Sequence, residues 1–115
     1  MILRDNERIR ETRVRMRGGE GETRVAYLPP AALASHVRLL GEIVIPAGAS
    51  IGNHVHEGET EWFLILSGRG GVNDDGRPEE VGPGDVVVTG GGAAHGIQSL
   101  GPGDLRMVAV IATDA

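Results

Sequence analysis

The chain has 115 residues, of which 40% are hydrophobic, and its net charge is −5. This length allows one domain with one hydrophobic core, and the negative charge argues against a nucleic-acid-binding protein. Cysteine and lysine are both absent, which excludes disulfides, thiolate metal sites, thiol nucleophiles, Walker-type phosphate loops and Schiff-base chemistry. Because no apolar run approaches roughly 18 residues and no signal-peptide pattern opens the chain, we expect a cytoplasmic protein that does not bind membranes.

The amino-terminal region differs in charge from the rest of the chain. Residues 1–24 contain seven arginines and five acidic residues, whereas residues 25–115 contain four arginines and eleven acidic residues. Arg13, Arg15 and Arg17 alternate along the sequence, as the solvent-facing side of an edge strand does. We therefore predict an arginine-rich arm or edge strand over residues 1–24 of a single domain that spans residues 1–115.

Short strands separated by glycine and proline are predicted for most of the remaining chain. One helical turn is expected at residues 30–34, because Pro30 suits a first helical position. The predicted strands cover residues 23–28, 37–45, 62–66, 85–89 and 105–112, with turns at residues 73–76 and 82–84. About eight to ten strands in a chain of this length indicate an all-β jelly-roll barrel or sandwich.

Two histidines and a glutamate lie at spacings that suit a shared site. His54 and His56 are two residues apart, so on a strand both imidazoles point to the same face. Glu61 follows five residues later and opens the next predicted strand, where it shares a face with Phe63 and Ile65. If that face lies inside a barrel, the carboxylate of Glu61 lies beside the two histidines.

His95 is expected to supply a fourth ligand from a distant part of the chain, after the glycine loop at residues 90–92. Three neutral imidazoles and one carboxylate leave about two positions open on an octahedral ion, and open positions distinguish a working metal site from a structural one. We predict that His54, His56, Glu61 and His95 bind a divalent metal ion. These ligand types accept manganese, iron, nickel or zinc.

Other functional patterns in the sequence fail on their context. Residues 48–52 fit a nucleophile-elbow pattern, but that elbow requires a strand-to-helix turn in a larger α/β sheet. Residues 56–60 begin like a zinc-protease helix but carry Thr60 where the second histidine is required. Residues 73–76 resemble only the middle of a calcium loop and are predicted to form a hairpin turn. His36, the remaining histidine, is expected to face solvent at the start of a strand.

Two longer motifs contain all four predicted ligands. The first resembles the complete first motif of the cupin family and consists of Gly48, His54, His56, Glu61 and Gly68, with five, one, four and six residues between them. The stretch 84–99, which contains His95, is similar to the second cupin motif. It departs at Gly90, where the family usually has proline, and at Ser99, where it often has asparagine. Both departures concern loop geometry and a nearby hydrogen bond, and neither removes a ligand.

The resemblance, carried by residues 48–99, implies a small double-stranded β-helix of the cupin type, usually dimeric, with the metal in the mouth of the barrel. Pairing of two copies would also cover edge strands, which otherwise invite aggregation. We expect residues 12–16 or the final strand at 105–112 to supply the edge of a homodimer.

Two classes of function remain open at this stage. The first is a metalloenzyme of the dioxygenase, decarboxylase, cyclase or isomerase type, acting on a small oxygen-rich or carboxylate-bearing molecule, with Glu61 doubling as a base. The second is a non-catalytic, metal-dependent module that binds or senses a small ligand. No further acid or base stands out, since Glu57 and Glu59 are expected to face water. The pocket is expected to be small, apolar and lined by Phe63, Ile97 and Met107.

Overall fold

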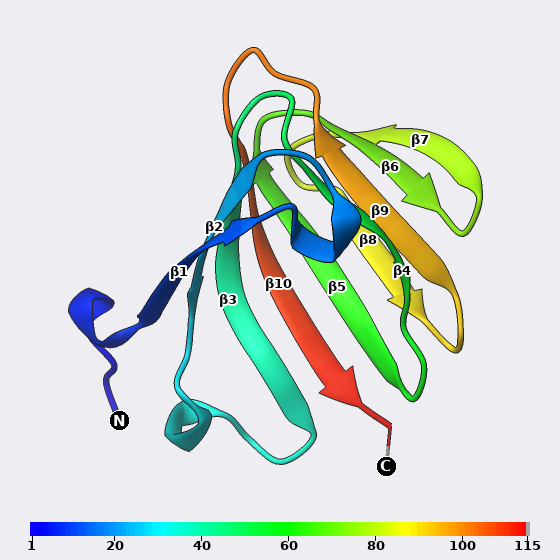
Figure 1. Ribbon diagram of the computed structural model, residues 1–115. Coiled ribbons are helices and arrows are strands. Elements are labelled where there is room, and N and C mark those ends of the chain that lie inside the picture. Colours follow the sequence, from blue (N-terminus) through cyan, green and yellow to red (C-terminus); the bar gives the residue numbers. More distant parts are fainter. Residues whose placement is uncertain (115) are drawn as a thin grey trace.

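The computed structural model describes residues 1–114, and most of these residues lie in β-strands (Figure 1). The strands are β1 Ile9–Val14, β2 Glu22–Tyr27, β3 Val37–Ile45, β4 Ser50–Val55, β5 Glu59–Ser67, β6 Gly70–Asp74, β7 Arg77–Val81, β8 Val86–Gly90, β9 Ala94–Ser99 and β10 Leu105–Thr113. Three short 3-10 turns accompany them: η1 Asp5–Glu7, η2 Met16–Gly18 and η3 Pro30–Ala32. Within residues 1–114, none of the helical turns is long and apolar enough to cross a membrane.

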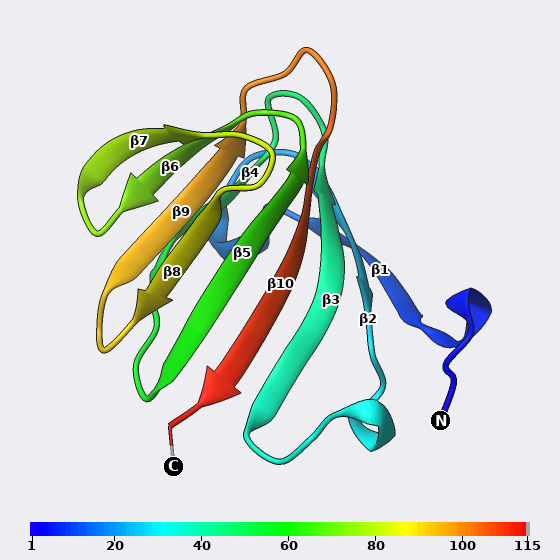
Figure 2. The ribbon, with the colours of Figure 1, turned by 180° about the vertical axis from the view of Figure 1, so that it is seen from behind.

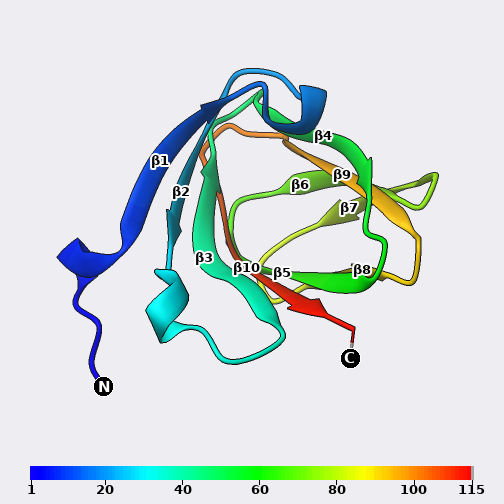
Figure 3. The ribbon, with the colours of Figure 1, turned by 60° about the horizontal axis from the view of Figure 1, so that its bottom comes forward.

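The strands form two antiparallel sheets that enclose the hydrophobic core. One sheet has the order β1-β2-β3-β10-β5-β8, and the other has the order β4-β9-β6-β7. Seen from one end, the four-stranded sheet lies opposite β10, β5 and β8 (Figure 3). Phe63 and Ile65 from the larger sheet and Ile97 from the smaller one are buried in the same apolar cluster. This arrangement confirms the predicted all-β class.

Several predicted elements agree with the observed ones. The strand predicted at residues 37–45 coincides with β3, and the strand at 105–112 coincides with β10 to within one residue. The hairpin turn between β6 and β7 places Asp75 at φ 48° and Gly76 at φ 92°, the left-handed region that such turns require. The helical turn predicted at residues 30–34 is shorter and covers only η3.

The expectation that β10 offers a free edge is wrong. β10 pairs with β3 on one side and with β5 on the other, so its backbone groups are already used inside the larger sheet. The edges of that sheet are β1 and β8. Nor do the three alternating arginines line one strand face, because only Arg13 lies on β1. Arg15 and Arg17 lie beyond the strand, with left-handed φ values of 51° and 54°.

The turn that carries Arg17 is fixed to strand β4 by two glycines. A Cβ atom on Gly52 would collide with the carbonyl oxygen of Arg17, and a Cβ atom on Gly19 would collide with the backbone of Ser50. The backbones of η2 and β4 therefore approach each other more closely than any other residue type would permit. As a result, a segment from the start of the chain lies beside the strand that carries His54.

Candidate metal centre

The fold brings the four predicted ligands together from three separate strands. His54 lies on β4 directly opposite His95 on β9, because these two residues are register partners. His56 follows the end of β4, and Glu61 lies on β5 in the facing sheet. One nitrogen or oxygen atom from each of these four residues lies within 4.8 Å of the others. The inward face of β5 predicted from the sequence is confirmed, since Glu61, Phe63 and Ile65 are all buried.

Four of the six distances between donor atoms match the coordination sphere of a divalent ion. Nε2 of His56 is 3.0 Å from Nε2 of His54 and 3.0 Å from Nε2 of His95. Oε1 of Glu61 is 2.9 Å from Nε2 of His56 and 3.0 Å from Nε2 of His95. Ligands that bind one ion at about 2.1 Å and at right angles to each other are themselves about 3.0 Å apart. The donor set of three imidazoles and one carboxylate therefore fits such an ion.

Each imidazole ring makes a hydrogen bond through Nδ1, the ring nitrogen that faces away from the centre of the cluster. These hydrogen bonds favour metal binding through Nε2. The Nδ1 atoms of the three histidines contact acceptors: the carbonyl oxygen of Gly52 at 2.7 Å from His54, Oε2 of Glu59 at 2.6 Å from His56, and the hydroxyl oxygen of Thr89 at 2.8 Å from His95. When Nδ1 carries the proton and donates it to these acceptors, Nε2 keeps a free lone pair. All three lone pairs are then available at the centre of the cluster.

Burial makes a metal ion the natural partner of this cluster. His56 is 2% exposed, His95 is 1% exposed and Glu61 is 5% exposed. A buried carboxylate is costly unless a cation compensates its charge, and the contacts of Glu61 within the described chain are to imidazole nitrogens. Burial also lowers the pKa of His54, which favours the neutral ring that a metal ligand must have. The ring of His95 stacks on Phe63, with centroids 4.8 Å apart.

A small pocket of about 70 Å³ opens beside the cluster and includes His54, His56 and Glu61 in its walls. Phe63 lines it as predicted, together with other apolar side chains. The prediction for Ile97 and Met107 is wrong, because both are buried in the core and neither belongs to the pocket wall. Both side chains belong to the apolar cluster that fills the barrel.

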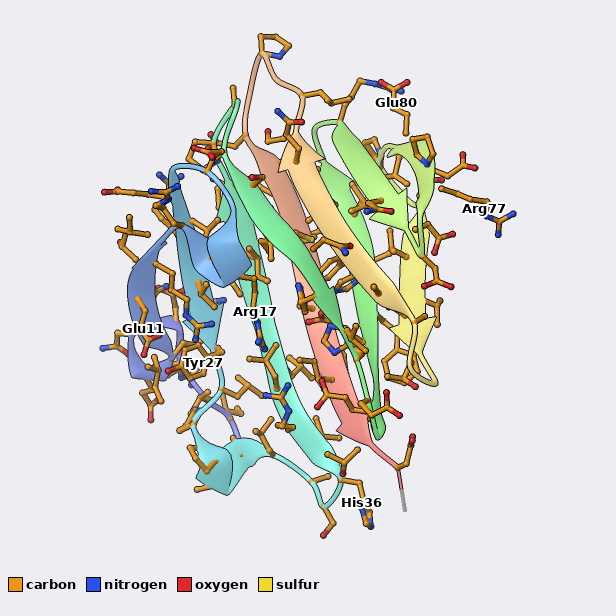
Figure 4. All side chains as sticks on the ribbon, turned by 45° about the vertical axis from the view of Figure 1, so that its right-hand side comes forward. Glu11, Arg17, Tyr27, His36, Arg77 and Glu80 are labelled. Atoms are coloured by element: carbon orange, nitrogen blue, oxygen red, sulfur yellow. The ribbon has the colours of Figure 1, made fainter. Side chains whose placement is uncertain are left out.

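Three arginines line the same pocket, which makes its entrance cationic: Arg13, Arg17 and Arg38. Arg13 is paired with Glu11, and Arg38 with Glu59, at 3.1 Å and 2.9 Å. The guanidinium of Arg17 makes no ion pair or hydrogen bond with any residue in 1–114. In Figure 4, the side chain of Arg17 lies just below the ribbon of η2, the turn to which Arg17 belongs. The sequence did not indicate this role, because Arg17 is 37 positions away from His54.

The expectation that Glu59 faces water is also wrong. Its side chain is 16% exposed, and its carboxylate contacts both His56 and Arg38. The neighbouring Glu57 is exposed, as predicted. His36 is exposed and precedes β3, also as predicted, and Figure 4 shows it at the start of that strand.

Comparison with known proteins gives the family. A model of the cupin domain matches residues 41–111. An oxalate-binding protein from Thermotoga maritima is 39% identical over 112 residues, which cover 96% of this chain and 93% of that protein. The chain therefore belongs to the cupin family, and the two sheets form its double-stranded β-helix.

Solved structures agree with this assignment. A protein from Thermotoga maritima described as a predicted oxalate decarboxylase superposes with a TM-score of 0.91 and 38% identity, over 98% of this chain and 99% of that one. The polyketide cyclase RemF from Streptomyces resistomycificus gives a TM-score of 0.76 at 25% identity, over 100% of this chain and 80% of that one. KdgF from Halomonas sp. is similar in fold alone, with a TM-score of 0.68 and 18% identity over 91% of this chain and 87% of that one.

Proposed function

We propose that this cupin binds a small dicarboxylate of the oxalate type on a divalent metal ion held by His54, His56, Glu61 and His95. The observation that carries the proposal is the pocket, which joins a metal-ligand cluster to a cationic entrance within about 70 Å³. Pockets for drug-sized molecules are typically about 300–1,000 Å³. A ligand of only a few heavy atoms fits this space, and a sugar or a flavonoid does not.

The metal-ligand cluster at one end of the pocket and Arg17 at the other indicate the chemistry of the ligand. Four protein ligands leave about two positions free on a six-coordinate ion, and adjacent oxygens of an α-dicarboxylate can fill both as a chelate. The outward oxygens of such a ligand would carry negative charge toward Arg17, whose guanidinium suits planar carboxylates. The names of two relatives, an oxalate-binding protein and a predicted oxalate decarboxylase, agree with this ligand class.

Turnover is the second candidate function, and the position of Glu61 favours it. Its carboxylate lies 2.9 Å from one imidazole and 3.0 Å from another, beside the same pocket. A carboxylate that leaves a metal ion can accept or return a proton next to the bound ligand. A decarboxylase would need such a group, because hydrogen must replace the carbon dioxide that leaves.

Calorimetric titration of oxalate into the metal-loaded and the metal-free protein tests the proposal. We expect one oxalate per chain with metal, none without it, and binding of acetate weaker by about 10–100-fold, since acetate lacks the second charged end. Equal binding in the presence and absence of metal would overturn the proposal. Oxalate that disappears as formate accumulates would support the enzymatic candidate, and stable oxalate would support binding alone.

A further inference from the structure

The metal pocket has a mostly apolar lining, for which oxalate alone does not account. More than half of the side chains that line it are apolar, among them Met16, Leu39 and Ile111. Oxalate carries oxygen atoms on every side and has no apolar group of its own. Charged oxygens that lie against apolar side chains lose water and gain no hydrogen bonds, which is costly. The lining therefore indicates a ligand that is partly apolar.

Two of these apolar side chains lie in one row with a residue of the metal cluster. Strand register aligns Leu39 on β3 with Ile111 on β10, and Ile111 with Glu61 on β5. Figure 2 shows these three strands side by side. Residues directly opposite each other on neighbouring strands point to the same face of the sheet, and all three line the pocket. We call Leu39 and Ile111 the apolar wall, which begins next to Glu61.

The apolar wall keeps surface that a ligand can cover. Leu39 is only partly buried and packs against the hydrophobic core, and Met16 does the same from the turn η2. Ile111 is 5% exposed. Covering exposed apolar surface with an apolar group is favourable, because it removes both surfaces from water. An alkyl group beside Leu39 would therefore add to the affinity of a ligand.

We propose that the pocket accepts 2-oxo acids with a short aliphatic chain, and that this chain packs on the apolar wall. A 2-oxo acid has two adjacent oxygen donors, one on its carboxylate and one on its carbonyl group, and so does oxalate. Both ligands can therefore fill the two free positions of a six-coordinate ion as a chelate. In the 2-oxo acid, an alkyl group replaces one oxygen of the second carboxylate. This ligand class rests on the proposed function, because it requires the same metal centre.

The charges at the entrance suit a ligand of this kind. Arg13 and Arg38 line the pocket but pair with Glu11 and Glu59. The guanidinium of Arg17 lines the pocket without a carboxylate partner in the part of the chain that the structure describes. The carboxylate of a 2-oxo acid provides one anionic group for this guanidinium. The charged end of the ligand thus matches Arg17, and its aliphatic chain matches the apolar wall.

The size of the pocket limits the length of the chain. The pocket volume is about 70 Å³. The turn η2, which carries Met16, is held against β4 by the close approach of Gly52 to the backbone of Arg17. Pyruvate has as many non-hydrogen atoms as oxalate, and 2-oxobutanoate is longer by a single CH₂ group. We expect these two acids to fit, and an aromatic 2-oxo acid such as phenylpyruvate to be excluded.

Calorimetric titration of the metal-loaded protein with pyruvate, 2-oxobutanoate and butanoate tests the proposal, with oxalate as the reference. The additional CH₂ group on the apolar wall should make 2-oxobutanoate bind about fourfold more tightly than pyruvate. Butanoate has the same carbon chain but no carbonyl oxygen for the ion. We expect it to bind about 10–100-fold more weakly than 2-oxobutanoate.

The variant Leu39→Asn tests the contact with the apolar wall, because asparagine is similar in shape to leucine but replaces two methyl groups with polar atoms. Leu40→Asn is the matched control, since Leu40 is an exposed neighbour on the opposite face of β3 and does not line the pocket. We expect the preference for 2-oxobutanoate over pyruvate to disappear in Leu39→Asn and to persist in Leu40→Asn. Unchanged circular dichroism shows that each variant is folded, and the titrations of wild type decide the question without the variants.

The four ligands separate this proposal from the proposed function. If oxalate binds but 2-oxobutanoate binds no more tightly than pyruvate, the apolar wall does not recognise the chain, although the proposed binding of oxalate stands. A preference that Leu39→Asn keeps as fully as Leu40→Asn would also overturn the role of the wall. If the 2-oxo acids bind with the expected preference and oxalate does not bind, oxalate is the wrong ligand and the role of the wall holds.

Discussion

Glu59 is bound to His56, with Oε2 of the carboxylate 2.6 Å from Nδ1 of the ring. The same carboxylate accepts two hydrogen bonds from Arg38, at 3.1 Å and 2.9 Å. Arg38, Glu59 and His56 therefore form a chain from the pocket entrance to the centre of the cluster. Glu59 fixes both the orientation and the tautomer of the imidazole, as carboxylates behind metal-bound histidines do.

Replacing Glu59 should weaken metal binding although Glu59 is not a ligand. In Glu59→Gln the side chain keeps an acceptor but loses the charge that polarises His56, so we expect metal affinity to fall about 10–100-fold. Competition with a fluorescent chelator measures this. Glu57→Gln removes an exposed carboxylate two residues away and serves as the control. Equal losses in both variants would show that overall charge, and not the contact with His56, sets the affinity.

Replacing Arg17 should weaken binding of the anion without changing binding of the metal ion. Its guanidinium lines the pocket without a carboxylate partner in the described chain, so Arg17→Gln should weaken oxalate binding by about 10–100-fold. Arg15→Gln is the matched control, because Arg15 is an exposed neighbour that the pocket does not include. Metal content should be the same in both variants. If Arg15→Gln and Arg17→Gln bind oxalate alike, the anion is held by other groups.

The close approach of the turn η2 to β4 should be sensitive to a single methyl group. Gly52→Ala places a Cβ against the carbonyl oxygen of Arg17, and overpacking of this kind costs about 1–3 kcal/mol. Urea unfolding measures the loss of free energy. Gly103→Ala is the control, since a Cβ there meets nothing within 4 Å and the residue has no positive φ. Full stability in Gly52→Ala would mean that the turn moves aside freely.

Removal of the metal should destabilise the fold. Binding to the folded state alone adds about 2.7 kcal/mol when the free ion is at 100 times its dissociation constant. For a chain of this size the corresponding change in Tm is on the order of 10 °C. Differential scanning calorimetry before and after treatment with a chelator measures it. If the Tm is unchanged in protein that the chelator has stripped of metal, metal binding does not stabilise the fold.

Three of the four residues in the cluster were predictable from their local spacing. His54, His56 and Glu61 lie within eight consecutive positions, and alternation along two strands settles which way they point. His95 was predicted as a distant fourth ligand and the second cupin motif supported it, but nothing in its own neighbourhood indicates that β9 pairs with β4. The all-β class followed from short apolar runs separated by turn residues.

The pocket entrance and the position of β10 were not predictable, because both depend on the pairing of distant segments. Arg17 reaches the site only through the contact of η2 with β4, and two glycines that permit this contact lie 33 positions apart. The position of β10 between β3 and β5 is likewise a property of the sheet order. The hydrophobic pattern of the final strand would be the same at the edge of the sheet and in its centre.

Metal analysis of the untagged protein is the most direct check on the proposed centre, with the double variant His54→Ala, His56→Ala beside it. His36→Ala is the control, because it removes an exposed histidine that does not belong to the cluster. We predict about one manganese, iron, nickel or zinc ion per chain in wild type and in His36→Ala, and none in the double variant. Absence of metal from wild type after reconstitution with each of these ions, or equal metal in all three proteins, would contradict the metal centre proposed for this cupin.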